Sequence, residues 1–256
     1  MITAAEIKDY ARSLGADIVG IGDTAHVPAS YPARPPQRLM PQAKRVISFG
    51  MGMLNGTLDS GNWNIAAQQA SMFYHELPFV AHRVGRLIEK AGYHAAIVGP
   101  SSPQEITKET RGMVGEVSHR HCAVAAGLGI LGKNRLLITR EFGPRVNLAT
   151  LITDAPLEAD QPLTDSLCSD CRICIDTCPA GALSEDGKTD TKKCLQHVTL
   201  YGMTRFVNYL SDMVPKPAEE QQKALKDLQF YQFLQHITFG LSYNCISCAR
   251  ECPAGR

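Results

Sequence analysis

The sequence lacks an uninterrupted apolar run of the about 18 residues that a membrane-spanning helix needs. It also lacks an excess of either charge, because 26 basic and 25 acidic residues leave a formal net charge of +1. The first absence argues against an integral membrane protein. The second gives no sign of the strongly basic surface that is typical of a nucleic-acid-binding protein. We therefore expect neither a membrane nor a nucleic acid as a partner.

The N-terminal segment, residues 1–22, has no apolar stretch behind a basic start and no twin-arginine signal. We therefore expect no signal peptide and a cytoplasmic location. Cysteines in that compartment are kept reduced and serve metals or catalysis. They are scarce over most of the chain: residues 1–154 contain only Cys122, whereas the other eight lie between Cys168 and Cys252. This shift predicts two regions, which we place at residues 1–160 and 161–256.

The first region alternates helix and strand patterns and predicts an α+β or α/β domain of mixed topology. We expect helices over 3–14, 76–91 and 119–126 and strands over 16–21, 44–50, 95–98, 136–139 and 146–153. The last two strands are predicted to pair around a Gly143-Pro144 turn, and the proline-rich residues 26–42 form a loop. In the second region, an insertion over residues 195–244 carries two helical patterns, at 195–213 and 218–238.

Two cysteine runs dominate the second region: three cysteines at x2-x2 spacing followed by x3-Cys-Pro, and a second Cys-x2-Cys-x3-Cys-Pro run. The first spacing lets three thiolates hold three irons of a [4Fe–4S] cubane, while the fourth cysteine ligates the other cluster. Zinc sites use separated pairs instead. This crossover predicts a bacterial-ferredoxin-like module with two clusters, whose ligand sets are Cys168, Cys171, Cys174 and Cys252, and Cys178, Cys194, Cys245 and Cys248. Cys122 has no partner cysteine nearby and is expected to be a buried core thiol.

The glycines Gly127, Gly129 and Gly132 follow a predicted helix, and Lys133 and Asn134 come directly after them. They permit close backbone approach and positive φ. A dinucleotide site is not expected, because the motif follows a helix rather than a strand and no acidic residue is placed for a ribose. The alternative to a ligand site is a helix C-cap and a tight turn.

Residues 126–160, AGLGILGKNRLLITREFGPRVNLATLITDAPLEAD, and the cysteine run that follows resemble the core of epoxyqueuosine reductase, a family related to the corrinoid reductive dehalogenases. GIGDT at 20–24, RVISFGMGM at 45–53 and Tyr74-His75 agree with this resemblance. It implies a nitroreductase-like domain that cradles a cobalamin, reduced by the nearer cluster. The glycine loop with Lys133 and Asn134 would lie against the corrinoid.

The same resemblance implies a low-potential electron donor, such as a ferredoxin or flavodoxin, and a small-molecule substrate. Arg135, Arg140 and Arg145 are candidate contacts to corrinoid phosphate or amide groups, or else solvated surface charges.

Three departures from the family pattern suggest a different substrate. Met113 stands where the family has an aspartate that is taken as the proton donor. The sequence stops soon after the second cysteine run, where the family continues, and the insertion at 195–244 is longer than expected. We therefore expect weak or no action on epoxyqueuosine tRNA. The remaining candidate proton donors are His119, which we favour, Glu116 and Tyr74.

Two other functions stay open. The chain could be an electron-transfer or activating protein that reduces a corrinoid or flavin partner without a substrate of its own. Alternatively, the cradle could hold FMN, since nitroreductase-like folds also bind that cofactor.

Overall fold

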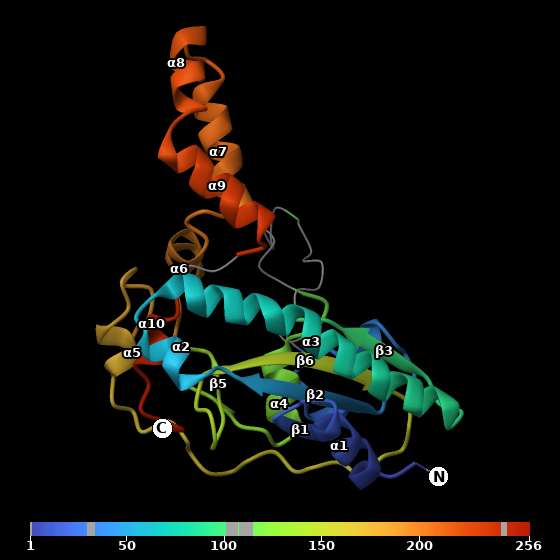
Figure 1. Cartoon of the computed structure of the whole chain (residues 1–256). Helices are drawn as coiled ribbons and strands as arrows, with labels where there is room; N and C mark the ends of the chain where they lie inside the picture. The colour runs from blue at the N-terminus through green and yellow to red at the C-terminus, as the bar shows by residue number, and fades with distance from the viewer. Residues whose placement is uncertain (1, 30–33, 101–106, 108–114, 242–244) are drawn as a thin grey trace.

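The computed structural model describes residues 2–29, 34–100, 107, 115–241 and 245–256 (Figure 1). Met113 lies outside these residues. The described chain forms a mixed α/β body from which a group of helices projects (Figure 1). None of the helices in the described ranges is both long and apolar enough to cross a membrane.

A four-stranded antiparallel sheet forms the centre of the body. Its strands, in spatial order, are β1 (Ile18–Asp23), β2 (Arg45–Gly52), β6 (Val146–Thr153) and β3 (Ala95–Val98). The predicted strands over 16–21, 44–50, 95–98 and 146–153 are confirmed to within about two residues at each end. The observed class is therefore the predicted α+β type.

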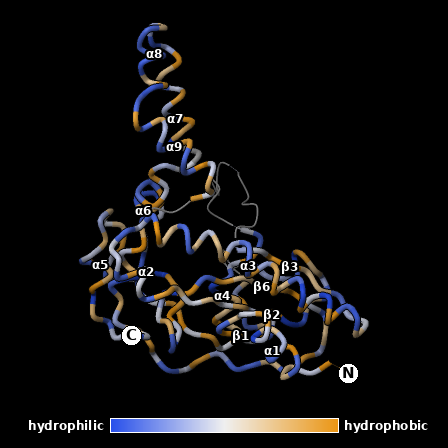
Figure 2. The backbone as a smooth tube through the Cα atoms, in the orientation of Figure 1, coloured by the Kyte–Doolittle hydropathy of each residue, from blue (hydrophilic) through white to orange (hydrophobic). Residues whose placement is uncertain are grey.

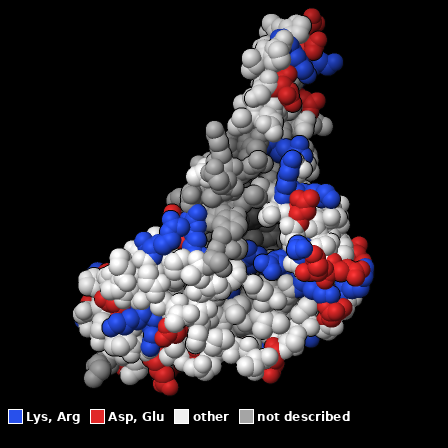
Figure 3. All heavy atoms as spheres, turned by 180° about the vertical axis from the view of Figure 1, so that it is seen from behind, with Lys and Arg blue, Asp and Glu red and all other residues white. Residues whose placement is uncertain are grey.

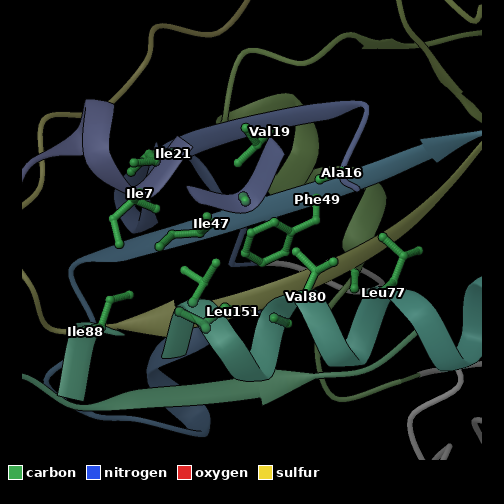
Figure 4. Close-up of a cluster of buried hydrophobic side chains, with 14 of the residues drawn as sticks. Ile7, Ala16, Val19, Ile21, Ile47, Phe49, Leu77, Val80, Ile88 and Leu151 are labelled. Carbon is green, nitrogen blue, oxygen red and sulfur yellow. The ribbon is translucent and has the colours of Figure 1, made fainter. Parts of the chain in front are cut away.

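Helices cover both faces of this sheet. α1 (Ala4–Ser13) and α3 (Trp63–Lys90) pack on one face, and α4 (His119–Ala125) packs on the other. Successive β2 side chains point to opposite faces, so Ile47 and Phe49 contact the α1 and α3 layer (Figure 4) while Val46 packs beside α4. Burial on both sides explains why β2 is apolar almost throughout.

The contact between α4 and the sheet depends on two glycines of β1. A Cβ added at Gly20 would lie 2.2 Å from the carbonyl oxygen of Ala126, and one at Gly22 would lie 2.6 Å from the carbonyl carbon of Ala125. Real Cβ atoms essentially never approach so closely. The GIGDT motif therefore lets the end of α4 lie directly on β1, which fixes the start of the glycine-rich loop.

The predicted pairing of strands 136–139 and 146–153 is wrong. β5 (Leu137–Ile138) pairs instead with β4 (Ile130–Leu131), and β6 lies between β2 and β3. The turn between them makes only an isolated bridge from Thr139 to Gly143. The physical reason is burial: β6 is apolar on both faces and belongs inside the covered sheet, so it cannot form a separate hairpin.

Several helices differ from the predicted ranges. α3 begins at Trp63, where Asn62 caps its N-terminus, and continues through Pro78. The described part of the insertion is divided further than the two predicted patterns: it contains the end of α6 (Thr191–Val198) and all of α7 (Met203–Met213), α8 (Ala218–Ala224) and α9 (Leu228–Thr238). The remaining short elements are η1 (Thr24–His26), η2 (Pro36–Arg38), α2 (Asn55–Asp59), α5 (Ile173–Asp176) and α10 (Ser247–Arg250).

Helices α7, α8 and α9 form an arm that projects from the body (Figure 1), and hydrophilic and hydrophobic residues alternate along it (Figure 2). Aromatic side chains fill the space between α7 and α9. The ring centroids of Phe206 and Phe233 lie 5.6 Å apart, and those of Tyr209 and Phe233 lie 5.5 Å apart. The aromatic residues of the insertion are thus largely the core of the arm, which is the usual role of such a stripe.

Candidate metal centre

The first predicted ligand set comes together from both cysteine runs. Burial raises the pKa of the Cys174 thiol, and the charges of Cys168, Cys252 and Cys171 raise it further. The same four cysteines line one cavity, together with Lys133 and Asn134 among other residues. Cys252 therefore lies with the three cysteines of the first run, although more than 70 residues separate it from Cys174 in sequence.

The second predicted set also combines the two runs. Burial raises the pKa of the Cys248 thiol to about 12, and Cys245, Cys194 and Cys178 act in the same direction. Burial also raises the pKa of the Cys194 thiol, and the charges of Cys178 and Cys245 raise it further. The charge of Cys174, from the first set, also raises the pKa of Cys248 by a smaller amount, so the two sets lie next to each other.

These cysteines surround a volume and do not converge on a point. In the described part of the chain, no three His, Cys, Asp or Glu side chains are close enough together to hold one metal ion. A cubane takes one thiolate for each of its four irons, so its ligands are spread around the cluster. The donor set, eight cysteines in two groups of four, fits two cubane clusters.

Hydrogen bonds from Arg145 connect the second cysteine run to the sheet. Arg145 stands at the start of β6, is only 3% exposed, and its guanidinium donates to four main-chain carbonyls of the C-terminal segment. The hydrogen bonds to Cys252 and Ala254 measure 2.8 and 2.6 Å. Arg145 is therefore neither a surface charge nor free for a corrinoid phosphate; its forked donors are used inside the protein.

The turn beside Arg145 contacts the same segment. Gly143 has a φ of +53°, and a Cβ there would lie 1.9 Å from the carbonyl oxygen of Ala254. Only glycine suits this close approach in a left-handed backbone conformation. The Gly143-Pro144 turn thus packs directly against the chain that follows Cys252.

Lys133 and Asn134 face the cysteine module. Lys133 forms an ion pair with Asp170, which lies between Cys168 and Cys171 in sequence. The Asn134 side chain donates to the carbonyl oxygen of Cys248 at 3.2 Å. These two residues therefore join the glycine-rich loop to both cysteine runs, and they border the cavity that the first ligand set lines.

The three loop glycines are packed against the chain itself. Gly127, with a φ of +70°, ends α4 in a Schellman motif, in which its own N–H bonds to Val124 and that of Leu128 to Ala123. A Cβ at Gly127 would meet the carbonyl oxygen of Gln161 at 2.5 Å. The other two glycines, Gly129 and Gly132, are similarly closed off by Ile138. Their geometry accounts for the glycines as a helix cap and tight turn, without a ligand.

His119, the favoured proton donor, is held inside the fold. Its Nε2 lies 3.0 Å from the carbonyl oxygen of Gly99 and its Nδ1 lies 2.9 Å from Oγ1 of Thr150. A carbonyl can only accept, so Nε2 carries the proton and Nδ1 accepts from the threonine. Burial lowers the pKa of His119 to about 4. The ring is thus neutral at pH 7 with both nitrogens engaged, which favours a structural role over proton donation.

The other two candidate proton donors, Tyr74 and Glu116, form no common site with His119 among the described residues. Tyr74 is half-buried on α3, on the opposite side of the sheet from α4, and Glu116 is half-buried just before α4. Cys122, as expected, is a fully buried thiol, and burial raises its pKa to about 12. The structure thus assembles the predicted cysteines but not the predicted acids.

Sequence reasoning missed His236, an aromatic neighbour of Trp63 and Tyr201. It is buried at the base of the arm.

Comparison with known proteins identifies relatives of the chain. It is 46% identical over 93 residues to the epoxyqueuosine reductase of Bacillus anthracis, covering 36% of this chain and 24% of that protein. It is 29% identical over 222 residues to the Gloeobacter violaceus epoxyqueuosine reductase, covering 77% of this chain and 66% of that protein. The chain therefore matches only part of the length of these relatives. No family model matches it.

Solved structures share the fold. An epoxyqueuosine reductase bound to a tRNA stem loop matches 98% of this chain and 64% of its own, with a TM-score of 0.58 and 20% identity. A reductive dehalogenase, whose structure was used to propose a mechanism for B12-dependent dehalogenation, matches 75% of this chain and 28% of its own, with a TM-score of 0.60 and 23% identity. By sequence the chain is thus similar to epoxyqueuosine reductases, and its fold is shared with an epoxyqueuosine reductase and a reductive dehalogenase.

Proposed function

We propose that the chain is an iron–sulfur, corrinoid-dependent oxidoreductase. The module over residues 161–256 holds two [4Fe–4S] clusters in a bacterial-ferredoxin-like arrangement, and the region over residues 1–160 is a nitroreductase-like cofactor domain. The relationship to epoxyqueuosine reductases supports the reductase class. The clusters accept single electrons from a low-potential donor such as a ferredoxin or flavodoxin.

The grouping of the thiols carries this proposal. Cys252 interacts with the first run, and Cys178 interacts with Cys194 and Cys248. This exchange of the last cysteine between runs is the arrangement that ferredoxins with two cubanes use. In such an arrangement the two clusters would lie close enough to pass an electron from one to the other.

Lys133 and Asn134 are the residues that would border a corrinoid on the side of the first ligand set. A corrinoid held there would supply a low-valent cobalt centre for the reduction of an organic substrate. The chain's own residues would orient the substrate and exclude water. Among the predicted acids, Glu116 and Tyr74 remain candidates for the proton donor, because His119 is engaged within the fold.

Two observations favour different classes of substrate. The net charge of +1 and the mixture of acidic and basic side chains on the face in Figure 3 favour a small molecule. A structural neighbour was solved with a tRNA stem loop, which favours a modified tRNA as the second candidate. Turnover assays with epoxyqueuosine-containing tRNA separate them: we expect little or none, and turnover matching that of an epoxyqueuosine reductase would favour the tRNA.

Electron delivery tests the function directly. We expect anaerobically prepared protein, supplied with a low-potential donor, to reduce added cobalamin catalytically. Cys171→Ala should lose most of this activity because it removes a ligand of the first cluster. Cys122→Ala is the matched control and should keep it, since Cys122 belongs to neither set. Equal loss in the two variants, or none in either, would contradict the assignment. Reduction of cobalamin by wild type without any substrate reduction would favour the activating-protein alternative.

A further inference from the structure

A cavity of about 610 Å³ lies where the arm joins the body, between the start of α3 and the end of α9. None of the residues proposed above for clusters or corrinoid lines it. Its lining consists of aromatic, amide and imidazole side chains with one leucine, namely Trp63, Asn64, Gln68, Tyr201, Gln232, Gln235, His236, Phe239 and Leu241. The volume is within the range of about 300–1,000 Å³ that small-molecule sites occupy.

His236 brings an unused hydrogen-bond acceptor to this cavity. The residue is 6% exposed, and its Nδ1 donates to the carbonyl oxygen of Gln232 at 2.7 Å. With its proton on Nδ1, the neutral imidazole carries its lone pair on Nε2. Nε2 is buried and has no hydrogen-bond partner among the residues that the structure describes. A buried polar atom without a partner is destabilising, so a ligand that donates a hydrogen bond to it removes that penalty.

The aromatic residues hold the imidazole in place. The ring of Trp63 stacks on His236 with centroids 5.4 Å apart, and the ring of Tyr201 lies 4.7 Å from it. These contacts preorganise Nε2 and provide flat apolar surfaces. An aromatic ligand can stack on such surfaces, and stacking adds to the affinity gained from burial of apolar area.

The charge of the lining limits the ligand further. No Lys, Arg, Asp or Glu occurs among the described residues that line the cavity. A phosphate or carboxylate would lose its hydration there without gaining a countercharge, which is costly. The four amide side chains can instead both donate to and accept from a neutral polar group. FMN is therefore a poor match for this cavity.

The cavity also borders the metal centre. Trp63 lines a second, smaller cavity of about 260 Å³, whose wall includes Cys245 of the second ligand set. A molecule stacked on Trp63 would thus lie one side chain away from that wall.

We propose that the cavity at the base of the arm binds a neutral aromatic small molecule that donates an O–H or N–H hydrogen bond to Nε2 of His236. The inference does not depend on the reductase function, because binding is measured without turnover. The competing occupant is a water molecule that satisfies Nε2 alone.

Trp63 is the only tryptophan of the chain, so its fluorescence reports on this cavity. The probe is 4-hydroxybenzamide, and 4-methoxybenzamide is its control, because the methyl ether removes the O–H donor. The wild-type protein with its clusters should bind the hydroxy compound saturably and about tenfold more tightly than the ether, the effect of one hydrogen bond. His236→Phe keeps an aromatic ring but no acceptor, so it should lose this preference. His82→Phe, at an exposed position of α3, should keep it.

The comparison of the two compounds in the wild-type protein stands even if His236→Phe fails to fold. Equal affinity for the two compounds in wild type would overturn the proposal. So would a preference that persists in folded His236→Phe. Absence of saturable fluorescence change with either compound up to its solubility limit would leave water as the occupant and would equally overturn it.

Discussion

The Nη1 atom of Arg145 donates a hydrogen bond of 2.8 Å to the carbonyl oxygen of Cys252. This contact joins the first residue before β6 to the last predicted cluster ligand, 107 residues later. It connects the sheet to the metal centre, because the same guanidinium also holds Ala254 and Gly255. The position of Cys252 beside the first run therefore depends on a residue outside the cysteine module.

Replacing Arg145 should loosen the metal centre. Arg145→Ala leaves buried carbonyls without donors and should cost at least about 3 kcal/mol in the free energy of unfolding. It should also lower iron retention at the first ligand set. The measurement is anaerobic urea denaturation together with iron analysis. Arg140→Ala is the control: it breaks an exposed ion pair with Asp165 and should cost less than about 1 kcal/mol. Similar effects of the two variants would contradict the role of Arg145.

The exchange of cysteines between runs makes a distinct prediction. Cys252→Ser and Cys171→Ser should damage the same cluster and leave the same residual electron paramagnetic resonance spectrum, although they lie in different runs. Cys248→Ser should damage the other cluster and leave a different spectrum. If Cys252→Ser instead matches Cys248→Ser, each run holds its own cluster and the proposed sets are incorrect.

The buried His119 predicts a pH dependence of stability. Its pKa is about 4 in the folded protein, below the ordinary value of 6.5. Between these values the unfolded chain binds more protons, so stability falls as the pH falls from 6.5 towards 4, by about 1.4 kcal/mol for each unit of pKa difference at most. His119→Gln removes this titration and should flatten the dependence in anaerobic denaturation at pH 5.5 and 7.5.

The same variant separates structure from catalysis at His119. His119→Gln weakens the bonds to Gly99 and Thr150 and should destabilise the fold at pH 7.5 by about 1–3 kcal/mol. Folded variant protein should reduce the organic substrate at the rate of wild type, because His119 is not the proton donor. A loss of about 10²–10⁴-fold in rate with unchanged stability would restore His119 as the general acid.

The sequence predicted local features more accurately than long-range ones. The helix over α1 followed from apolar spacing, and the structure adds a capping box between Thr3 and Glu6. The cysteine spacing predicted the grouping of thiols because it follows from cluster chemistry. In contrast, the environment of His119 depends on Thr150, which is 31 residues away and reaches it only through the sheet.

The loop glycines illustrate the same limit. Pattern alone left a ligand site and a helix cap as alternatives for Gly127 and Gly129. The answer depends on Gln161 and Ile138, which close the space beside these glycines. Likewise, strand 136–139 has a strand pattern, but its partner is set by which faces of β6 are buried. Such contacts are properties of the packed chain and have no local signal.

Cofactor titration distinguishes corrinoid from flavin. The proposed corrinoid-dependent function predicts that the anaerobic protein binds added cobalamin with the lower base detached from cobalt. Electron paramagnetic resonance of the Co(II) form should then lack the splitting from the base nitrogen. A spectrum identical to that of free cofactor, combined with tight binding of FMN, would favour the flavin alternative.

Iron and acid-labile sulfide analysis of anaerobically purified protein tests the central claim most directly. Two cubanes predict about eight irons and about eight sulfides per chain, and the reduced protein should give the signal of two interacting [4Fe–4S] clusters. Cys122→Ala should leave these values unchanged. Zinc in place of iron, or about four irons per chain after full reconstitution, would contradict the account.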